Sequence, residues 1–156
     1  MTLDVVNPLA VGEDPIEFAE RVAPFIRNVH LKDYYIYLTP QGYRLIRSPL
    51  GEGVMDFPAL FKLLDEKAPN AYLNVELAAQ NERHIRIHDQ DWWTDYPEEH
   101  RERVKSGLAL AEKRGRRGDD WQTRWERGED CDAIKAGEMQ DLEESVEYLR
   151  SIGKLA

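Results

Sequence analysis

Three side chains of the kinds that bind divalent metals stand near the ends of three predicted β-strands. They are Asp4, His30 and Glu76. If the strands are parallel neighbours, their carboxyl ends share one edge of the sheet, where ligands of α/β proteins bind. Two carboxylates and one imidazole suit Mn²⁺, Mg²⁺ or Co²⁺ better than a structural zinc ion. The pattern therefore predicts a divalent-metal site. Such an ion would act as a Lewis acid on a carbonyl or enediolate oxygen, as isomerisation or epimerisation next to a carbonyl requires.

Two further features bear on this chemistry. Glu52 lies in the loop Gly51-Glu52-Gly53. It either contacts the substrate or belongs only to a turn whose glycines supply positive φ. His84 and His88 are four residues apart, but the glutamate of a His-Glu-x-x-His motif is missing, which disfavours a second metal site.

Predicted strands and helices alternate around these residues. The strands cover residues 2–6, 28–32 and 71–77, a β-hairpin joins residues 34–38 to 43–46, and helices cover residues 15–26 and 57–64. Asp14 and Asp56 are suitable N-caps, and Pro15 suits the first helical position. Because the helices are long enough to cross between strands, we expect a parallel sheet in an α/β fold.

Four motifs carry a family resemblance. They are Leu3-Asp4-Val5-Val6-Asn7-Pro8, Val29-His30-Leu31-Lys32-Asp33, Gly51-Glu52-Gly53-Val54-Met55-Asp56 and Asn74-Val75-Glu76. In this order and spacing they resemble the C-terminal part of the sugar phosphate isomerase/epimerase family, which has a xylose isomerase-like TIM barrel. The similarity covers about residues 2–93.

The resemblance implies roles for individual residues. Asp4, His30 and Glu76 match metal ligands on the last three barrel strands, and Glu76 also matches one of two acid/base glutamates. Asn7 matches a position where relatives contact the substrate with a histidine. Lys32 would either neutralise an enediolate or a phosphate, or be an ordinary surface lysine. The implied substrate is a small sugar or polyol-like molecule.

The predicted strands are too few for a whole barrel. A TIM barrel has eight strands and about 250 residues, whereas the predictions place three core strands in residues 1–96. The family's remaining ligand, a second acid/base glutamate, would precede Met1. We therefore expect the last three βα units of a partial TIM-barrel-like sheet with a β-hairpin insertion. We also expect the isolated chain to be inactive unless another polypeptide completes the barrel.

Charge divides the chain near residue 96. Residues 1–96 carry 15 acidic and 9 basic side chains, and residues 97–156 carry 15 and 12. We predict that residues 1–96 are the barrel portion and that residues 97–156 are a charged helical C-terminal extension. Its amphipathic helices would cover residues 101–113 and 139–152, with a loop or marginal helix between them.

Composition limits the partners and the compartment. The net charge of −9 disfavours binding to nucleic acid or to anionic membranes. Cys131 is the only cysteine, which suits a reducing compartment. No apolar run approaches the roughly 18 residues of a membrane span. We therefore expect a cytoplasmic protein with no membrane and no nucleic-acid partner.

Three other functions remain compatible with the sequence. One is a dehydratase acting on a cyclic polyol or a shikimate-type acid. Another is an endonuclease IV-like hydrolase of the same superfamily, which the charge and the scarcity of histidine near the strand ends disfavour. The third is a non-catalytic partial barrel that serves as a binding or assembly subunit. Because an open sheet edge invites pairing, we also expect self-association or a barrel-completing chain.

Overall fold

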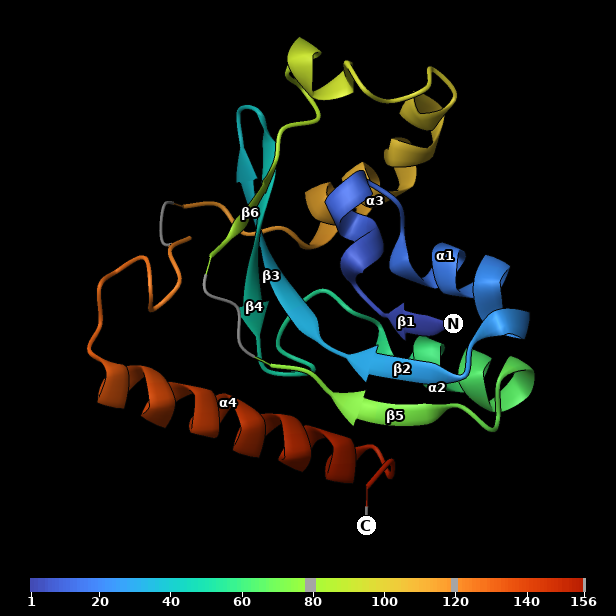
Figure 1. The fold of residues 1–156 in the computed structure, drawn as a ribbon, viewed down its shortest axis with the longest axis vertical. Coiled ribbons are helices and arrows are strands. Elements are labelled where there is room, and N and C mark those ends of the chain that lie inside the picture. The colour runs from blue at the N-terminus through green and yellow to red at the C-terminus, as the bar shows by residue number, and fades with distance from the viewer. Residues whose placement is uncertain (78–80, 119–120, 156) are drawn as a thin grey trace.

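The computed structural model describes residues 1–77, 81–118 and 121–155 (Figure 1). Short 3-10 helices are written η. In chain order the elements are β1 (Thr2–Asp4), η1 (Asn7–Val11), α1 (Pro15–Val22), η2 (Ala23–Phe25), β2 (Asn28–Leu31), β3 (Asp33–Thr39), β4 (Gly42–Ser48), α2 (Phe57–Lys67), β5 (Tyr72–Val75), β6 (Arg83–Ile85), η3 (Gln90–Trp93), α3 (His100–Arg114) and α4 (Cys131–Ser151).

A three-stranded parallel sheet forms the first layer, in the order β1-β2-β5. This confirms the predicted α/β class and the parallel sheet. The crossover helices begin at the predicted caps: Asp14 Oδ1 accepts from the backbone N–H of Ile16 and Glu17, and Asp56 Oδ1 accepts from that of Ala59. Helices α1 and α2 contact each other, and apolar side chains between them and the strands make up much of the core.

The predicted hairpin is present as β3 and β4, which pair antiparallel from Asp33 opposite Ser48 to Thr39 opposite Gly42. Strand β6, which was not predicted, adds to β4 and completes a second sheet in the order β3-β4-β6. Gly42 allows this close pairing, because a Cβ there would lie 2.1 Å from the carbonyl oxygen of Ile85. The hairpin thus projects from the parallel sheet as a separate antiparallel layer (Figure 1).

Helices α3 and α4 pack on the first part of the chain. Ala111 and Leu149 are buried in the common core. The backbone N–H of Leu50 donates to Ser145 Oγ of α4 over 3.0 Å. These contacts join α3 and α4 to residues on the other side of the predicted boundary at residue 96. The two helices thereby bury apolar side chains that a freely solvated extension would expose. Residues 78–80 of the predicted barrel portion, and residues 119, 120 and 156 of the extension, lie outside the described residues.

The C-terminal helices differ in how well their bounds were predicted. Helix α3 matches the prediction to within one residue at each end. Helix α4 begins at Cys131 rather than at residue 139, because Asp130 caps it by accepting from the backbone N–H of Asp132 and Ala133. The described residues between α3 and α4, 115–118 and 121–130, form no long helix, as predicted.

Candidate metal centre

The register of the parallel sheet brings the three predicted ligands together. Asp4 at the end of β1 lies opposite His30 in β2. Glu76 follows β5 directly, and its backbone N–H donates to the carbonyl oxygen of Leu31 over 2.8 Å. The cluster therefore stands at the carboxyl ends of three neighbouring parallel strands, which is the usual position of ligand sites in such sheets.

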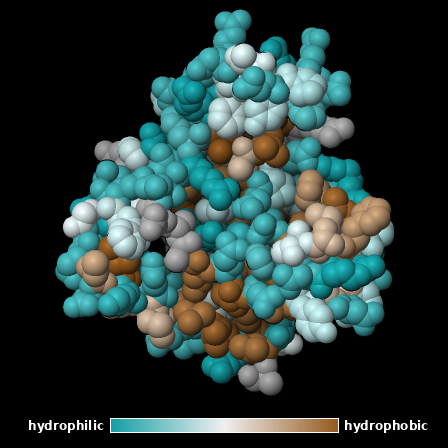
Figure 2. Space-filling model, viewed as in Figure 1, coloured by the Kyte–Doolittle hydropathy of each residue, from teal (hydrophilic) through white to brown (hydrophobic). Residues whose placement is uncertain are grey.

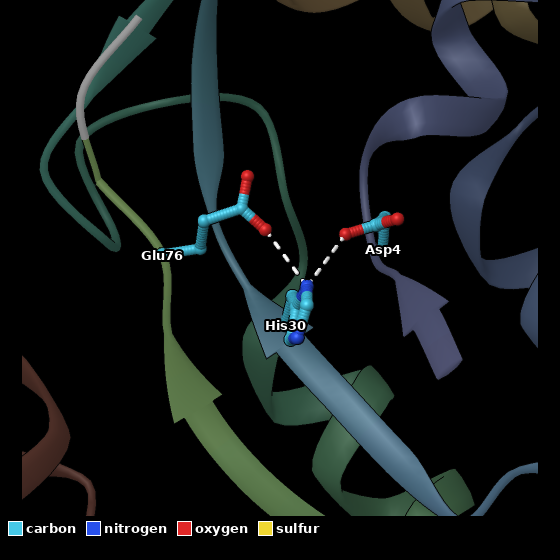
Figure 3. A group of neighbouring side chains, drawn as sticks. All are labelled: Asp4, His30 and Glu76. Carbon is cyan, nitrogen blue, oxygen red and sulfur yellow. Dashed lines mark hydrogen bonds and ion pairs between the residues drawn. The ribbon is translucent and has the colours of Figure 1, made fainter.

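The side chains of Asp4, His30 and Glu76 point toward one another (Figure 3). His30 Nδ1 lies 3.0 Å from Asp4 Oδ1 and 2.8 Å from Glu76 Oε2. One potential ligand atom from each residue lies within 4.8 Å of the others, and this is the only such group of three or more among the described residues. Each of the three side chains is about a third exposed, so solvent and ions can reach the cluster.

Lys32, the fourth predicted residue at this edge, completes the arrangement. Strand alternation places it on the same face of the sheet as His30, two residues earlier. Its Nζ lies 2.7 Å from Asp4 Oδ1 and 2.6 Å from Glu76 Oε1, and its side chain is only 3% exposed. The ammonium group therefore bridges the two carboxylates that were predicted to bind a metal.

The charge state of Asp4 follows from these neighbours. Burial is the largest single influence and acts to raise the pKa of Asp4. Hydrogen bonds and charges from Lys32 and His30 together outweigh it, so the pKa lies below its usual value. Asp4 is therefore ionised at neutral pH, which is the form that binds a cation.

Arg47 also reaches the cluster, although the sequence analysis did not single it out. Its Nη1 donates to the backbone carbonyl oxygen of Glu76 over 3.2 Å, and its Nη2 lies 3.5 Å from Glu76 Oε1. The guanidinium lies over the ring of Tyr34. Arg47 follows Tyr43 and Leu45 at alternate positions of β4, both of which are buried. A cation that continues a buried face requires a partner, and this alternation is the signal that could have identified it.

Asp33 has a structural role beside the cluster. Its side chain is fully buried, Oδ1 accepts from the backbone N–H of Tyr34 and Met55, and Oδ2 accepts from that of Gly51 and Gly53. Three of these hydrogen bonds, from Gly51, Gly53 and Met55, attach the loop between β4 and α2 to the first residue of β3. The loop that carries Glu52 is therefore fixed relative to the cluster by a single carboxylate.

The remaining sequence candidates lie apart from the cluster contacts. Asn7 begins η1, and its Oδ1 lies 3.5 Å from Nη1 of Arg83. Glu52 is exposed at the tip of its loop. Among the hydrogen bonds and ion pairs of the described residues, neither joins Asp4, His30 or Glu76. His84 lies in β6 rather than on a helix, and its Nε2 pairs with Thr39 Oγ1.

The donor set and its spacing fit a hard divalent cation. Two ligands of one ion stand at most about 4.4 Å apart when metal–ligand distances are about 2.0–2.2 Å, and the three atoms here lie within 4.8 Å of one another. The spacing of the three atoms is therefore close to that of ligands around one ion. Asp4 and Glu76 offer carboxylate oxygens and His30 an imidazole nitrogen, which leaves further positions to water or substrate.

No protein-family model, curated protein or solved structure matches the chain. Within residues 1–77, 81–118 and 121–155, no helix combines the length and the apolar character needed to cross a membrane.

Proposed function

We propose that the chain is the metal-binding part of a sugar phosphate isomerase/epimerase-like protein, built on the last units of a xylose isomerase-like barrel. The reaction is proton transfer next to a carbonyl of a small sugar or polyol-like substrate. The observation that carries the proposal is the convergence of Asp4, His30 and Glu76 at the carboxyl ends of β1, β2 and β5.

The side chains divide the chemistry between them. Asp4, His30 and Glu76 would hold Mn²⁺, Mg²⁺ or Co²⁺, which supplies Lewis-acid polarisation of the substrate carbonyl. Glu76 would also take the proton from the adjacent carbon, because a carboxylate has a second oxygen beyond the one that binds a cation. The exposure of the Glu76 side chain, 37%, leaves room for a substrate beside it.

Two neighbours would support this step. Lys32 has its ammonium at the cluster and can neutralise negative charge that develops on a substrate oxygen. Arg47 holds Glu76 by both its backbone oxygen and its carboxylate, and so orients the base. The Asn7 amide and the loop that carries Glu52 would form walls of the substrate site, farther from the ion.

The proposal requires a further group on the opposite face of the substrate. Inversion at carbon needs proton donors on both faces, and Glu76 serves one of them. We therefore assign this chain one half of the acid/base pair. The other half, with further strands, would come from a barrel-completing chain or a second copy.

The outer edge of the parallel sheet supports such a partner. Among the described residues β5 pairs only with β2, and Tyr72 and Leu73 of β5 are exposed. Figure 2 shows hydrophobic residues exposed in the part of the molecule where α4 and β5 lie in Figure 1. An edge of this kind also favours the second candidate function, a non-catalytic subunit that binds or assembles with others. Light scattering after size-exclusion chromatography tests self-association, and a strictly monomeric chain would contradict it.

Two enzyme alternatives share the same ligand chemistry. A dehydratase of a cyclic polyol or shikimate-type acid would also use a cation and a base at this edge. An endonuclease IV-like hydrolase would need more histidine ligands. The net charge of −9 would also repel the phosphates of its nucleic-acid substrate.

A Mn²⁺ titration followed by electron paramagnetic resonance tests the proposal. The intact chain should bind about one ion, and His30→Ala and Glu76→Ala should each weaken binding at least tenfold. The matched controls are His88→Ala and Glu66→Ala, because both side chains are exposed and away from the cluster. Equal affinity in the wild type and in both cluster variants would refute the site.

A further inference from the structure

The charges at the cluster are already balanced by side chains. Asp4 and Glu76 supply two carboxylates, and Lys32 and Arg47 supply two cations. Lys32 makes the closer contacts, 2.7 Å to Asp4 Oδ1 and 2.6 Å to Glu76 Oε1. A divalent ion at this site would therefore arrive at carboxylates that already have a counter-ion.

The lysine and the ion would compete for the same two carboxylates. A metal bound to Asp4 and Glu76 would stand about 2.1–2.3 Å from one oxygen of each carboxylate. Lys32 Nζ is within hydrogen-bond distance of one oxygen of each carboxylate at once. If both cations kept these contacts, they would stand only a few ångströms apart and repel each other strongly, because a partly buried position screens charge poorly.

The burial of Lys32 fixes its ammonium group against the two carboxylates. The side chain is 3% exposed, so its ammonium is not a surface group that reaches the cluster by chance. A buried ammonium keeps its charge only when it is paired and hydrogen-bonded, and the two carboxylates provide that pairing. His30 Nδ1 also lies against both carboxylates. If the Lys32 ammonium moved away, the three ligand side chains would remain together and could bind a metal.

We propose that Lys32 is the resident counter-cation of this centre, and that a divalent metal binds by displacing its ammonium from Asp4 and Glu76. This inference rests on the metal site of the proposed function and adds a determinant of its affinity. Metal affinity then depends on the three ligands and also on the competition between the Lys32 ammonium and the ion for the two carboxylates. Removing the lysine charge should strengthen metal binding, whereas removing a ligand should weaken it.

The test compares Mn²⁺ affinities of the full chain near pH 7, measured by electron paramagnetic resonance of the free ion. Lys32→Met keeps the length of the side chain and removes the charge, and it should bind Mn²⁺ at least tenfold more tightly than the wild type. Lys62→Met changes an exposed lysine in the same way and should leave the affinity unchanged. The double variant Lys32→Met/His30→Ala should lose the gain.

The outcomes separate the two proposals. If His30→Ala weakens binding but Lys32→Met binds Mn²⁺ no more tightly than the wild type, the metal site stands and the competition is refuted. If affinity is the same in the wild type, His30→Ala and Glu76→Ala, the proposed metal site itself fails. No binding by either the wild type or Lys32→Met contradicts both.

A measurement on the wild type covers the case in which Lys32→Met does not fold. The Lys32 side-chain ammonium, labelled with ¹⁵N, should give a resonance that exchanges slowly because of its two ion pairs. Saturating Mg²⁺ should shift this resonance or accelerate its exchange with water. An unchanged Lys32 signal in a chain that binds Mg²⁺ would refute the displacement.

Discussion

Replacing Asp33 with asparagine should destabilise the protein more than any other single-atom change near the candidate site. The Asp33 carboxylate is fully buried and accepts four backbone N–H groups, from Tyr34, Gly51, Gly53 and Met55, at 2.9–3.1 Å. An asparagine has one oxygen and one NH₂ group. Whichever way it is oriented, the NH₂ group faces two N–H donors that it cannot satisfy.

The magnitude follows from those two donors. A buried donor left without its partner costs about 1–3 kcal/mol, so Asp33→Asn should lower the free energy of unfolding by about 4 kcal/mol. That is a large share of the roughly 5–15 kcal/mol typical of a domain. Because the lost hydrogen bonds involve either the loop glycines or Tyr34 and Met55, the segment from Gly51 to Met55 should loosen first.

Urea unfolding followed by tryptophan fluorescence measures this effect, and amide hydrogen exchange of Gly51 and Gly53 locates it. Asp65→Asn is the matched control, because Asp65 is exposed and, in the part of the chain that the structure describes, pairs only with Lys154, in a surface ion pair worth at most about 1 kcal/mol. A loss below about 1 kcal/mol for Asp33→Asn would refute the reasoning, since it would mean that the buried carboxylate does not hold the loop through its three hydrogen bonds to Gly51, Gly53 and Met55.

Three further perturbations test the packing around the site. Burial raises the pKa of Asp33 to about 6 against the opposing effect of its four N–H donors, so the folded protein takes up a proton between about pH 6 and pH 4 that the unfolded chain does not. The stability advantage of the wild type over Asp33→Asn should therefore grow, by roughly 2 kcal/mol, as the pH falls from 7 to 4.5 in urea unfolding; an advantage that shrinks would contradict this. Ser145→Ala should cost about 1–2 kcal/mol in the same assay, because the buried N–H of Leu50 loses its acceptor, and no loss would show that water replaces the hydroxyl. Gly51→Ala should cost about 1–3 kcal/mol, because φ is +85° and a Cβ would lie 2.5 Å from the ring of Tyr148; thermal unfolding at an unchanged midpoint would contradict it.

The gathering of Asp4, His30 and Glu76 could be predicted from the sequence because it depends on few assumptions. Each residue stands within two residues of the end of a predicted strand, and parallel strands bring their carboxyl ends to one edge. Lys32 follows from His30 by strand alternation. The hairpin was predictable for the same local reason, since Thr39-Pro40-Gln41-Gly42 separates two runs of β-forming residues.

The features that were missed depend on contacts between distant segments. Strand β6 consists of Arg83, His84 and Ile85, which carry no apolar alternation, and its extended form comes from pairing with β4. The first turns of α4 lack an apolar stripe around Gly137, which fits there because a Cβ would meet Arg124. The role of Asp33 likewise depends on tertiary partners that no local pattern specifies, whereas for Arg47 the alternation in β4 indicates a buried position but not its partner Glu76.

Crystals of the full chain soaked in Mn²⁺ test the central claim most directly, through the anomalous scattering of the ion. We expect one strong peak between Asp4, His30 and Glu76, about 2.0–2.3 Å from an atom of each, with the Lys32 ammonium moved away from both carboxylates. Mn²⁺ bound elsewhere, with Lys32 still bridging Asp4 and Glu76, would contradict the assignment of this cluster as a metal centre.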